Sequence, residues 1–133
     1  MAVTEDAALG NDTHFLAVQA AAEGYCRALH AQDTDALARI FHGDAHLYAP
    51  GADGLVNWPL AVFLERVASR APAGGEPDFT IHSVDLAGPD MACVKLSVAV
   101  PPRRYTDYLN FLKLDGEWRV IAKVFRVAEG PPL

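Results

Sequence analysis

Cysteine is scarce in this 133-residue sequence, which contains only Cys26 and Cys93. Both lie beside apolar residues in segments of regular pattern, so we expect buried, reduced thiols rather than a disulfide framework. Membrane-spanning apolar runs are also lacking. The acidic segment 1–12 has neither the basic nor the apolar part of a signal peptide. The sequence therefore predicts a cytoplasmic protein with no membrane partner.

Positive charge is in the minority, because 11 lysines and arginines stand against 17 aspartates and glutamates, for a net charge of −6. No run of basic residues offers phosphate neutralisation, which argues against a nucleic-acid partner. The sequence also has no glycine-rich phosphate loop, no Cys-x-x-Cys pair and no evident Ser-His-Asp order. We therefore predict no cofactor.

What the sequence does contain is ample apolar material, at 51% of residues. A chain of this length can bury one core without a disulfide or a metal. The Pro- and Gly-rich segment 71–77 separates a helical first half from a strand-rich second half, an order typical of α+β proteins. We divide the chain into a flexible N-terminus at 1–11, a single domain at 12–128 and a C-terminal tail at 129–133.

Three helices are expected in the first half of the chain. The first begins at Asp12 or Thr13, both good N-caps, the second follows Asp33, and the third has Pro59 at its first position. Apolar residues recur at helical spacing in these segments. The inward-facing residues are predicted to be Phe15, Val18, Ala22, Tyr25 and Leu29, then Leu37, Ile40 and Phe41, then Leu60, Phe63, Leu64 and Val67.

Strands dominate the second half. Short strands at 44–48 and 55–58 precede the third helix, and longer ones follow at 79–86 and 91–100. The alternation in 79–86 slips in phase near its middle, between Ile81 and Val84, which indicates a bulge or bend. In the next strand one face is apolar throughout, with Ala92, Val94, Leu96, Val98 and Val100.

Asp115-Gly116 lies between two long β-rich runs and predicts a two-residue type I′ hairpin, which fixes the register of its strands. The inner face would pair Lys113 with Trp118, Phe111 with Val120, Leu109 with Ala122, Asp107 with Val124 and Tyr105 with Arg126. The outer face would carry Leu112, Arg119, Asn110, Ile121, Tyr108, Lys123, Thr106 and Phe125. There Lys123 would pair with Tyr108 or a ligand anion, or extend its stem over an interface.

The hairpin is apolar on both faces, so both need covering. Helices cover one face. We expect a second copy of the chain to cover the other, giving a homodimer through the outer sheet face, the alternative being a covering loop. Asp107 stands out on the inner face, because a carboxylate there costs free energy unless it is paired or protonated. It is a functional candidate; the alternative is an edge carboxylate, solvated or paired with Arg104 or Arg126.

Further polar candidates lie earlier in the chain. His42, Asp44 and His46 alternate and could hold a divalent metal. Since His42 belongs to the helix-end turn, we predict no metal and instead place His46 or Tyr48 in a pocket, where His46 could act as a base near neutral pH. Trp58 either stacks on a flat ligand or fills the core.

The order of elements resembles the nuclear transport factor 2-like superfamily, which includes SnoaL-like cyclases and ketosteroid isomerases, and within it the putative lumazine-binding group. The segments Phe41–Tyr48, Tyr105–Val120 and Lys123–Phe125 carry this resemblance, which spans roughly residues 12–127. It implies a cone-like α+β fold, with three N-terminal helices on a curved antiparallel sheet. It also implies one pocket for a small apolar or heterocyclic molecule.

The resemblance also implies roles for single residues. In the isomerases a tyrosine on the first helix and a protonated aspartate on a late strand form an oxyanion hole, and a second aspartate is the base. The matching positions are Tyr25 and Asp107, but the base position before Pro50 is Ala49. We therefore expect a small-molecule-binding protein. The alternatives are an isomerase, cyclase or dehydratase with Asp107 and Tyr25 as acid and oxyanion-stabilising groups, or a dimeric interaction module without ligand. The expected ligand-binding residues are Tyr25, His46, Tyr48, Trp58, Tyr105, Asp107, Leu109 and Val124.

Overall fold

Three helices and six strands make up the computed structural model, which describes the backbone of residues 2–133 and the side chains of residues 12–133. In chain order the elements are α1 (Ala2–Ala31), α2 (Thr34–Ile40), β1 (Phe41–Gly51), β2 (Gly54–Pro59), α3 (Leu60–Ser69), β3 (Phe79–Leu86), β4 (Met91–Val100), β5 (Arg103–Leu114) and β6 (Glu117–Glu129). The strands form one sheet in the order β2-β1-β6-β5-β4-β3.

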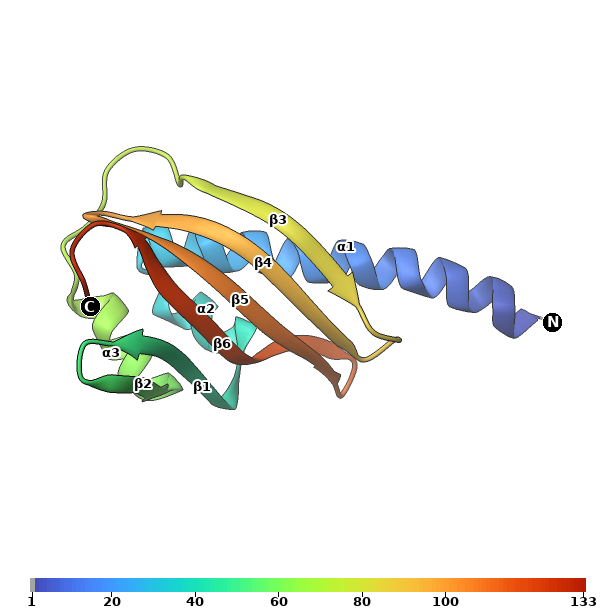
Figure 1. Cartoon of the computed structure of the whole chain (residues 1–133). Coiled ribbons are helices and arrows are strands. Elements are labelled where there is room, and N and C mark those ends of the chain that lie inside the picture. Colours follow the sequence, from blue (N-terminus) through green and yellow to red (C-terminus); the bar gives the residue numbers. More distant parts are fainter. Residues whose placement is uncertain (1) are drawn as a thin grey trace.

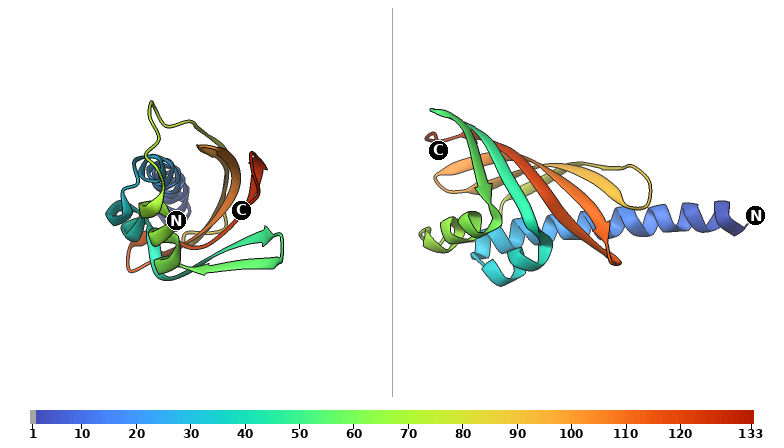
Figure 2. Two further views of the ribbon diagram at one scale, coloured as in Figure 1. Left: turned by 90° about the vertical axis from the view of Figure 1, so that its left-hand side faces the viewer. Right: turned by 90° about the horizontal axis from the view of Figure 1, so that it is seen from below.

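The sheet curves around the helices, which all lie on its concave side (Figures 1 and 2). Helix α1 runs along this concave face, and α3 lies beside the C-terminal end of the chain (Figure 1). This arrangement confirms the α+β fold with three helices on a curved sheet. The sheet is mixed rather than wholly antiparallel, because β1 and β6 run parallel while the other neighbours are antiparallel.

Helix α1 begins at Ala2, well before the predicted N-caps Asp12 and Thr13. The preceding segment includes Ala2, Ala7 and Ala8, and alanine has the highest helix propensity. Its predicted inward stripe is buried from Val18 onwards, whereas Phe15 is 39% exposed. The side chains of residues 2–11, part of the predicted flexible N-terminus, lie outside the described residues.

Helix α2 begins directly after Asp33, as predicted, whereas α3 begins at Leu60, one residue after the predicted first position, Pro59. The Asp33 carboxylate accepts a hydrogen bond of 3.0 Å from the backbone N–H of Ala36 and caps α2. Pro59 directly precedes α3, whose residues Leu60, Phe63 and Val67 are buried. The second helix ends at Ile40, and the backbone enters β1 at once.

The strands of the second half agree with their apolar patterns. In β4 alternate residues from Ala92 to Val100 are buried, and the register of β3 against β4 shifts between Ile81 and Ser83, as the phase slip predicted. Asp115 and Gly116 have φ values of 51° and 81°, both in the left-handed region that a type I′ turn requires. The predicted hairpin is thus confirmed.

The predicted hairpin register is correct near the turn and wrong beyond it. Phe111 pairs with Val120 as expected, but the next pair is Asn110 with Ala122, which leaves Ile121 as an extra residue on β6. Because of this bulge, every β6 residue from Ala122 onwards lies on the face opposite to the predicted one. Leu109 now pairs with Lys123, Asp107 with Phe125 and Tyr105 with Val127.

The bulge decides which side chains of β6 reach the concave side. Lys123 and Phe125, predicted for the outer face, are 4% exposed each and point inward. Val124 and Arg126, predicted for the inner face, are exposed instead.

None of the helices in the described part of the chain has both the length and the hydropathy that a membrane crossing needs.

Candidate functional site

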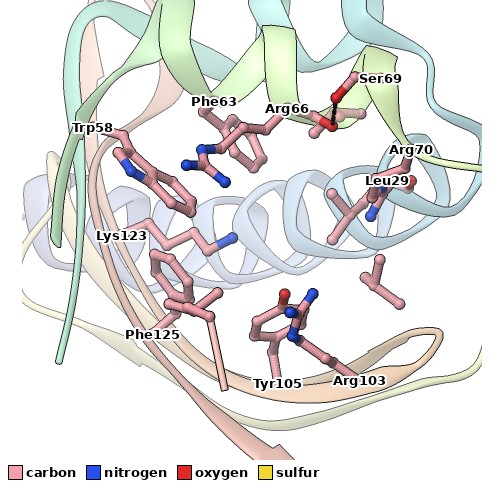
Figure 3. Close-up of a pocket in the computed structure, with 13 residues that line it drawn as sticks. Leu29, Trp58, Phe63, Arg66, Ser69, Arg70, Arg103, Tyr105, Lys123 and Phe125 are labelled. Carbon is pink, nitrogen blue, oxygen red and sulfur yellow. Dashed lines mark hydrogen bonds between the residues drawn. The ribbon is translucent and has the colours of Figure 1, made fainter. Parts of the chain in front are cut away.

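A cavity of about 240 Å³ opens between α3, β2 and the concave face of the sheet (Figure 3). Helix α3 supplies one wall, and β5 and β6 supply the opposite one. Its lining residues are Leu29, Trp58, Phe63, Arg66, Val67, Ser69, Arg70, Val100, Arg103, Tyr105, Lys123, Phe125 and Leu133.

Aromatic rings form one side of this pocket. Phe125 lies between Trp58 and Tyr105, with ring centroids 5.6 Å and 5.8 Å away. The Arg66 guanidinium lies over the Trp58 ring, 4.2 Å from its centroid. Such a stacked cation and the rings beside it suit a flat, unsaturated ligand.

The charged side chains of the pocket are all cationic. Arg66, Arg70, Arg103 and Lys123 line it, and no carboxylate side chain does so among the described lining residues. Arg70 donates a 2.6 Å hydrogen bond to the Leu29 carbonyl oxygen, which anchors it to the end of α1. In a chain of net charge −6, this local excess of positive charge favours an anionic group.

Behind the pocket lies a buried hydrogen-bonded cluster of Lys123, Tyr25 and Asp107. The Tyr25 hydroxyl donates to Asp107 Oδ2 at 2.6 Å, and Lys123 Nζ donates to the Tyr25 oxygen at 2.6 Å. Lys123 Nζ also lies 3.6 Å from Asp107 Oδ2. Tyr25 and Asp107 are fully buried. Asp107 Oδ1 has no hydrogen-bond partner among the described residues.

The pKa values of Lys123 and Tyr25 are shifted in this cluster. Burial lowers the pKa of Lys123, and the Asp107 carboxylate opposes that shift. Burial raises the pKa of Tyr25 well above its usual value, and Asp107 adds to the effect. Lys123 Nζ lies 4.8 Å and 4.6 Å from the ring centroids of Phe63 and Phe125, so these rings replace water around much of the ammonium.

The structure brings some of the predicted site residues together. Tyr25 and Asp107 are in direct contact, and Trp58 and Tyr105 line the pocket. Asp107 is therefore not the solvated edge carboxylate of the alternative interpretation. Of the two arginines that were its possible partners, Arg104 is paired with Asp78.

Other predicted residues lie elsewhere. His46 and Tyr48 are on the face of β1 opposite its buried residues, where His46 Nδ1 is hydrogen-bonded to Asn57 Oδ1 at 2.7 Å. Val124 is 45% exposed on the outer face of the sheet, because of the bulge at Ile121. Leu109 is fully buried and is not among the lining residues of the pocket.

The alternating His42-Asp44-His46 segment does not converge on one point. The His42 ring accepts a 3.0 Å hydrogen bond from the Asp44 backbone N–H, whereas His46 contacts β2. Cys26 is buried and free, and burial raises the pKa of its thiol to about 12. Cys93 is half-buried and also free.

Sequence reasoning did not place Lys123, Phe125 or the arginines in the pocket. Lys123 and Phe125 were assigned to the wrong face of β6, because the bulge at Ile121 was not predicted. Arg66 and Arg70 lie four residues apart, so they can be placed on one side of the end of α3. That spacing was a usable signal.

A curved mixed sheet with three helices on its concave side defines a nuclear transport factor 2-like, cystatin-like protein. The chain belongs to the family described as "Putative lumazine-binding", whose model matches residues 13–126. This membership and the fold confirm the predicted superfamily and group.

Relatives and solved structures agree with this placement. A nuclear transport factor 2-like protein of unknown function from Silicibacter pomeroyi DSS-3 is 30% identical, with a TM-score of 0.81 over 88% of this chain and 98% of that one. Aldolase FrzH from Cladobotryum sp is 28% identical over 111 residues, 82% of this chain and 87% of the relative. A putative scytalone dehydratase from Novosphingobium aromaticivorans DSM 12444 shares the fold, at 16% identity and a TM-score of 0.71 over 93% of this chain and 90% of that one.

Proposed function

We propose that this protein binds a small, flat, anionic molecule in the pocket between α3 and the sheet. The observation that carries the proposal is the Arg66–Trp58 stack at a cavity whose other charged side chains, Arg70, Arg103 and Lys123, are also cationic. A volume of about 240 Å³ suits a one- or two-ring compound. The family description supports a heterocyclic ligand of the lumazine type.

Charge discrimination is the test of this proposal. We expect pterin-6-carboxylate to bind about tenfold more tightly than 6-methylpterin, which has a neutral methyl group in place of the carboxylate, because charge-assisted hydrogen bonds contribute about 1.5–3 kcal/mol. Arg66→Gln should remove most of this preference. Isothermal titration calorimetry measures both affinities.

Arg119→Gln is the matched control for that experiment. Arg119 is paired with Glu117 near the β5–β6 turn and is not a lining residue of the pocket, so the preference should survive its replacement. Equal affinities for the two pterins in the unaltered protein, or a preference that Arg66→Gln leaves intact, would count against an anion-binding pocket.

A homodimer through the outer face of the sheet is part of the proposal. Met91, Tyr108 and Val124 are 50%, 45% and 45% exposed on this face, with Leu112 and Ile121 beside them. We call these five residues the outer-face patch. Apolar surface of this kind on a regular sheet suits an isologous interface, in which the same patch is contributed twice.

Placing a charge in the outer-face patch is expected to separate the subunits. Val124→Glu should convert a dimer into a monomer, since each subunit would bury an unpaired carboxylate in the interface. Size-exclusion chromatography with light scattering measures the mass. Leu55→Glu on β2 is the control, because Leu55 is 73% exposed and lies outside the patch. A monomeric mass for the unaltered protein at tens of micromolar would rule out the dimer.

An enzyme that handles a carbonyl compound is the second candidate function, favoured by the Lys123–Tyr25–Asp107 cluster at the pocket wall. The name of the aldolase relative supports carbonyl chemistry. An oxyanion hole of the isomerase type fits less well, because the Tyr25 hydroxyl donates its proton to Asp107 rather than to the pocket. In addition, Ala49 occupies the position of the base.

A further inference from the structure

Lys123 belongs both to the pocket and to the buried cluster behind it. Its side chain lines the pocket and extends between Trp58 and Phe125, with Nζ at the tip (Figure 3). The same nitrogen donates to the Tyr25 hydroxyl, 2.6 Å away, and lies 3.6 Å from Asp107 Oδ2. A primary amine on a pocket-lining residue, in contact with a hydroxyl and close to a carboxylate, has the parts needed for covalent chemistry.

We propose that Lys123 is a nucleophile that forms a reversible Schiff base with an aldehyde or ketone entering the pocket. The proposal rests on the small-molecule binding proposed above and adds the reactive class of the ligand. Among the described lining residues Lys123 alone supplies an amine, because the other charged side chains are arginines, whose guanidinium groups stay protonated. Lysine is the residue that forms imines with carbonyl substrates.

The cluster can remove the proton that keeps the amine unreactive. Lys123 gives a proton to the Tyr25 oxygen while the Tyr25 hydroxyl proton passes to Asp107 Oδ2, along two hydrogen bonds of 2.6 Å each. The result is a neutral amine, a neutral tyrosine and a protonated Asp107. The other carboxylate oxygen, Asp107 Oδ1, accepts no hydrogen bond from the described residues.

Formation of the imine conserves atoms and charge. The free electron pair of Lys123 Nζ attacks the carbonyl carbon, and an N–H proton moves to the carbonyl oxygen, giving a carbinolamine. The proton held by Asp107 returns through Tyr25 to the carbinolamine hydroxyl, the C–O bond breaks, and water leaves. The sum is ammonium plus carbonyl giving protonated imine plus water, and Asp107 is again a carboxylate beside the cationic imine.

The surroundings favour this product. Phe63 and Phe125 lie 4.8 Å and 4.6 Å from Nζ and restrict the access of water that would hydrolyse the imine. The protonated imine keeps the positive charge that Asp107 and the ring faces already accommodate. Burial also lowers the pKa of Lys123, which raises the fraction of free amine at a given pH.

Reductive trapping tests the proposal, with 4-formylbenzoate as the probe and sodium cyanoborohydride as the reductant. The chain has three lysines, Lys95, Lys113 and Lys123, so the first two serve as internal references. We expect Lys123 to be modified at least tenfold faster than either, as read by intact mass and peptide mapping. The Lys95→Arg/Lys113→Arg variant, which leaves the cluster untouched, should still take up one equivalent at Lys123.

Tyr25→Phe separates chemistry from binding. It removes the hydroxyl that links Lys123 to Asp107, so trapping at Lys123 should slow at least tenfold, while the affinity for the unreactive analogue 4-methylbenzoate is retained. Trapping of Lys123 no faster than Lys95 in the unaltered protein, despite bound 4-methylbenzoate, overturns the Schiff base and leaves the pocket standing. Absence of 4-methylbenzoate binding overturns the anion-binding pocket instead, and the relative trapping rates still decide the role of Lys123.

Discussion

Asp107→Leu is expected to lower the free energy of unfolding by about 3–5 kcal/mol, because it leaves the Lys123 ammonium buried without its carboxylate. Lys123 is 4% exposed, and its other neighbours, Tyr25 and the phenylalanine rings, supply no full negative charge. Urea unfolding followed by circular dichroism gives the free energy. A matched surface control is Asp78→Ala, whose partner Arg104 is partly exposed and whose loss should cost about 1 kcal/mol or less.

Removing the whole cluster should cost much less than the single changes suggest. In Tyr25→Phe/Asp107→Leu/Lys123→Met no buried polar group of the cluster is left unpaired, so we expect stability to recover most of the loss caused by Asp107→Leu. That recovery would show that the cluster does not stabilise the fold relative to apolar residues of similar size. A loss of under 1 kcal/mol for Asp107→Leu alone would instead mean that Lys123 already escapes to solvent.

Deleting Val124 is expected to prevent folding or to cost more than about 4 kcal/mol, whereas deleting Ile121 is expected to cost less than about 2 kcal/mol. Without Ile121 the β6 strand loses its bulge, and Lys123 and Phe125 keep their inward positions. Without Val124 either Phe125 turns outward and Arg126 inward, or the bulge is lost and Lys123 turns outward.

The two deletions remove apolar residues from the same strand, so each is the control for the other. Soluble yield and urea midpoints of both variants rank their stabilities. If the Val124 deletion proved the milder of the two, the bulge at Ile121 would not be what holds Lys123 and Phe125 on the concave side.

The bulge also shows where sequence reasoning stops. The slip in β3 was visible, because the apolar phase changes between Ile81 and Val84. At the β6 bulge, Val120-Ile121-Ala122 is a run of three apolar residues, and either phase of alternation fits it. A bulge of this kind needs no glycine or proline to mark it, so the register error could not be detected locally.

The candidate site was predictable to a similar degree. Tyr25 and Asp107 followed from the resemblance and from a carboxylate on an apolar face. For Arg66 and Arg70 the four-residue spacing places both side chains on one side of α3, but it does not say what that side faces. The packing of Arg66 on Trp58 directs it toward the cavity. The apolar faces of β4 and α3 were predictable, since burial alone dictates them.

The parallel pairing of β1 with β6 has a consequence for the order of assembly. Leu47 pairs with Lys123, so the contact spans most of the domain, whereas β5 and β6 are joined by a two-residue turn. Closing the long loop between β1 and β6 costs more chain entropy than forming the β5–β6 hairpin. We expect the hairpin to form early and β1 to dock late, bringing β2 and α3 with it. The pocket, whose walls come from both groups, then exists only once the last strand to dock is in place.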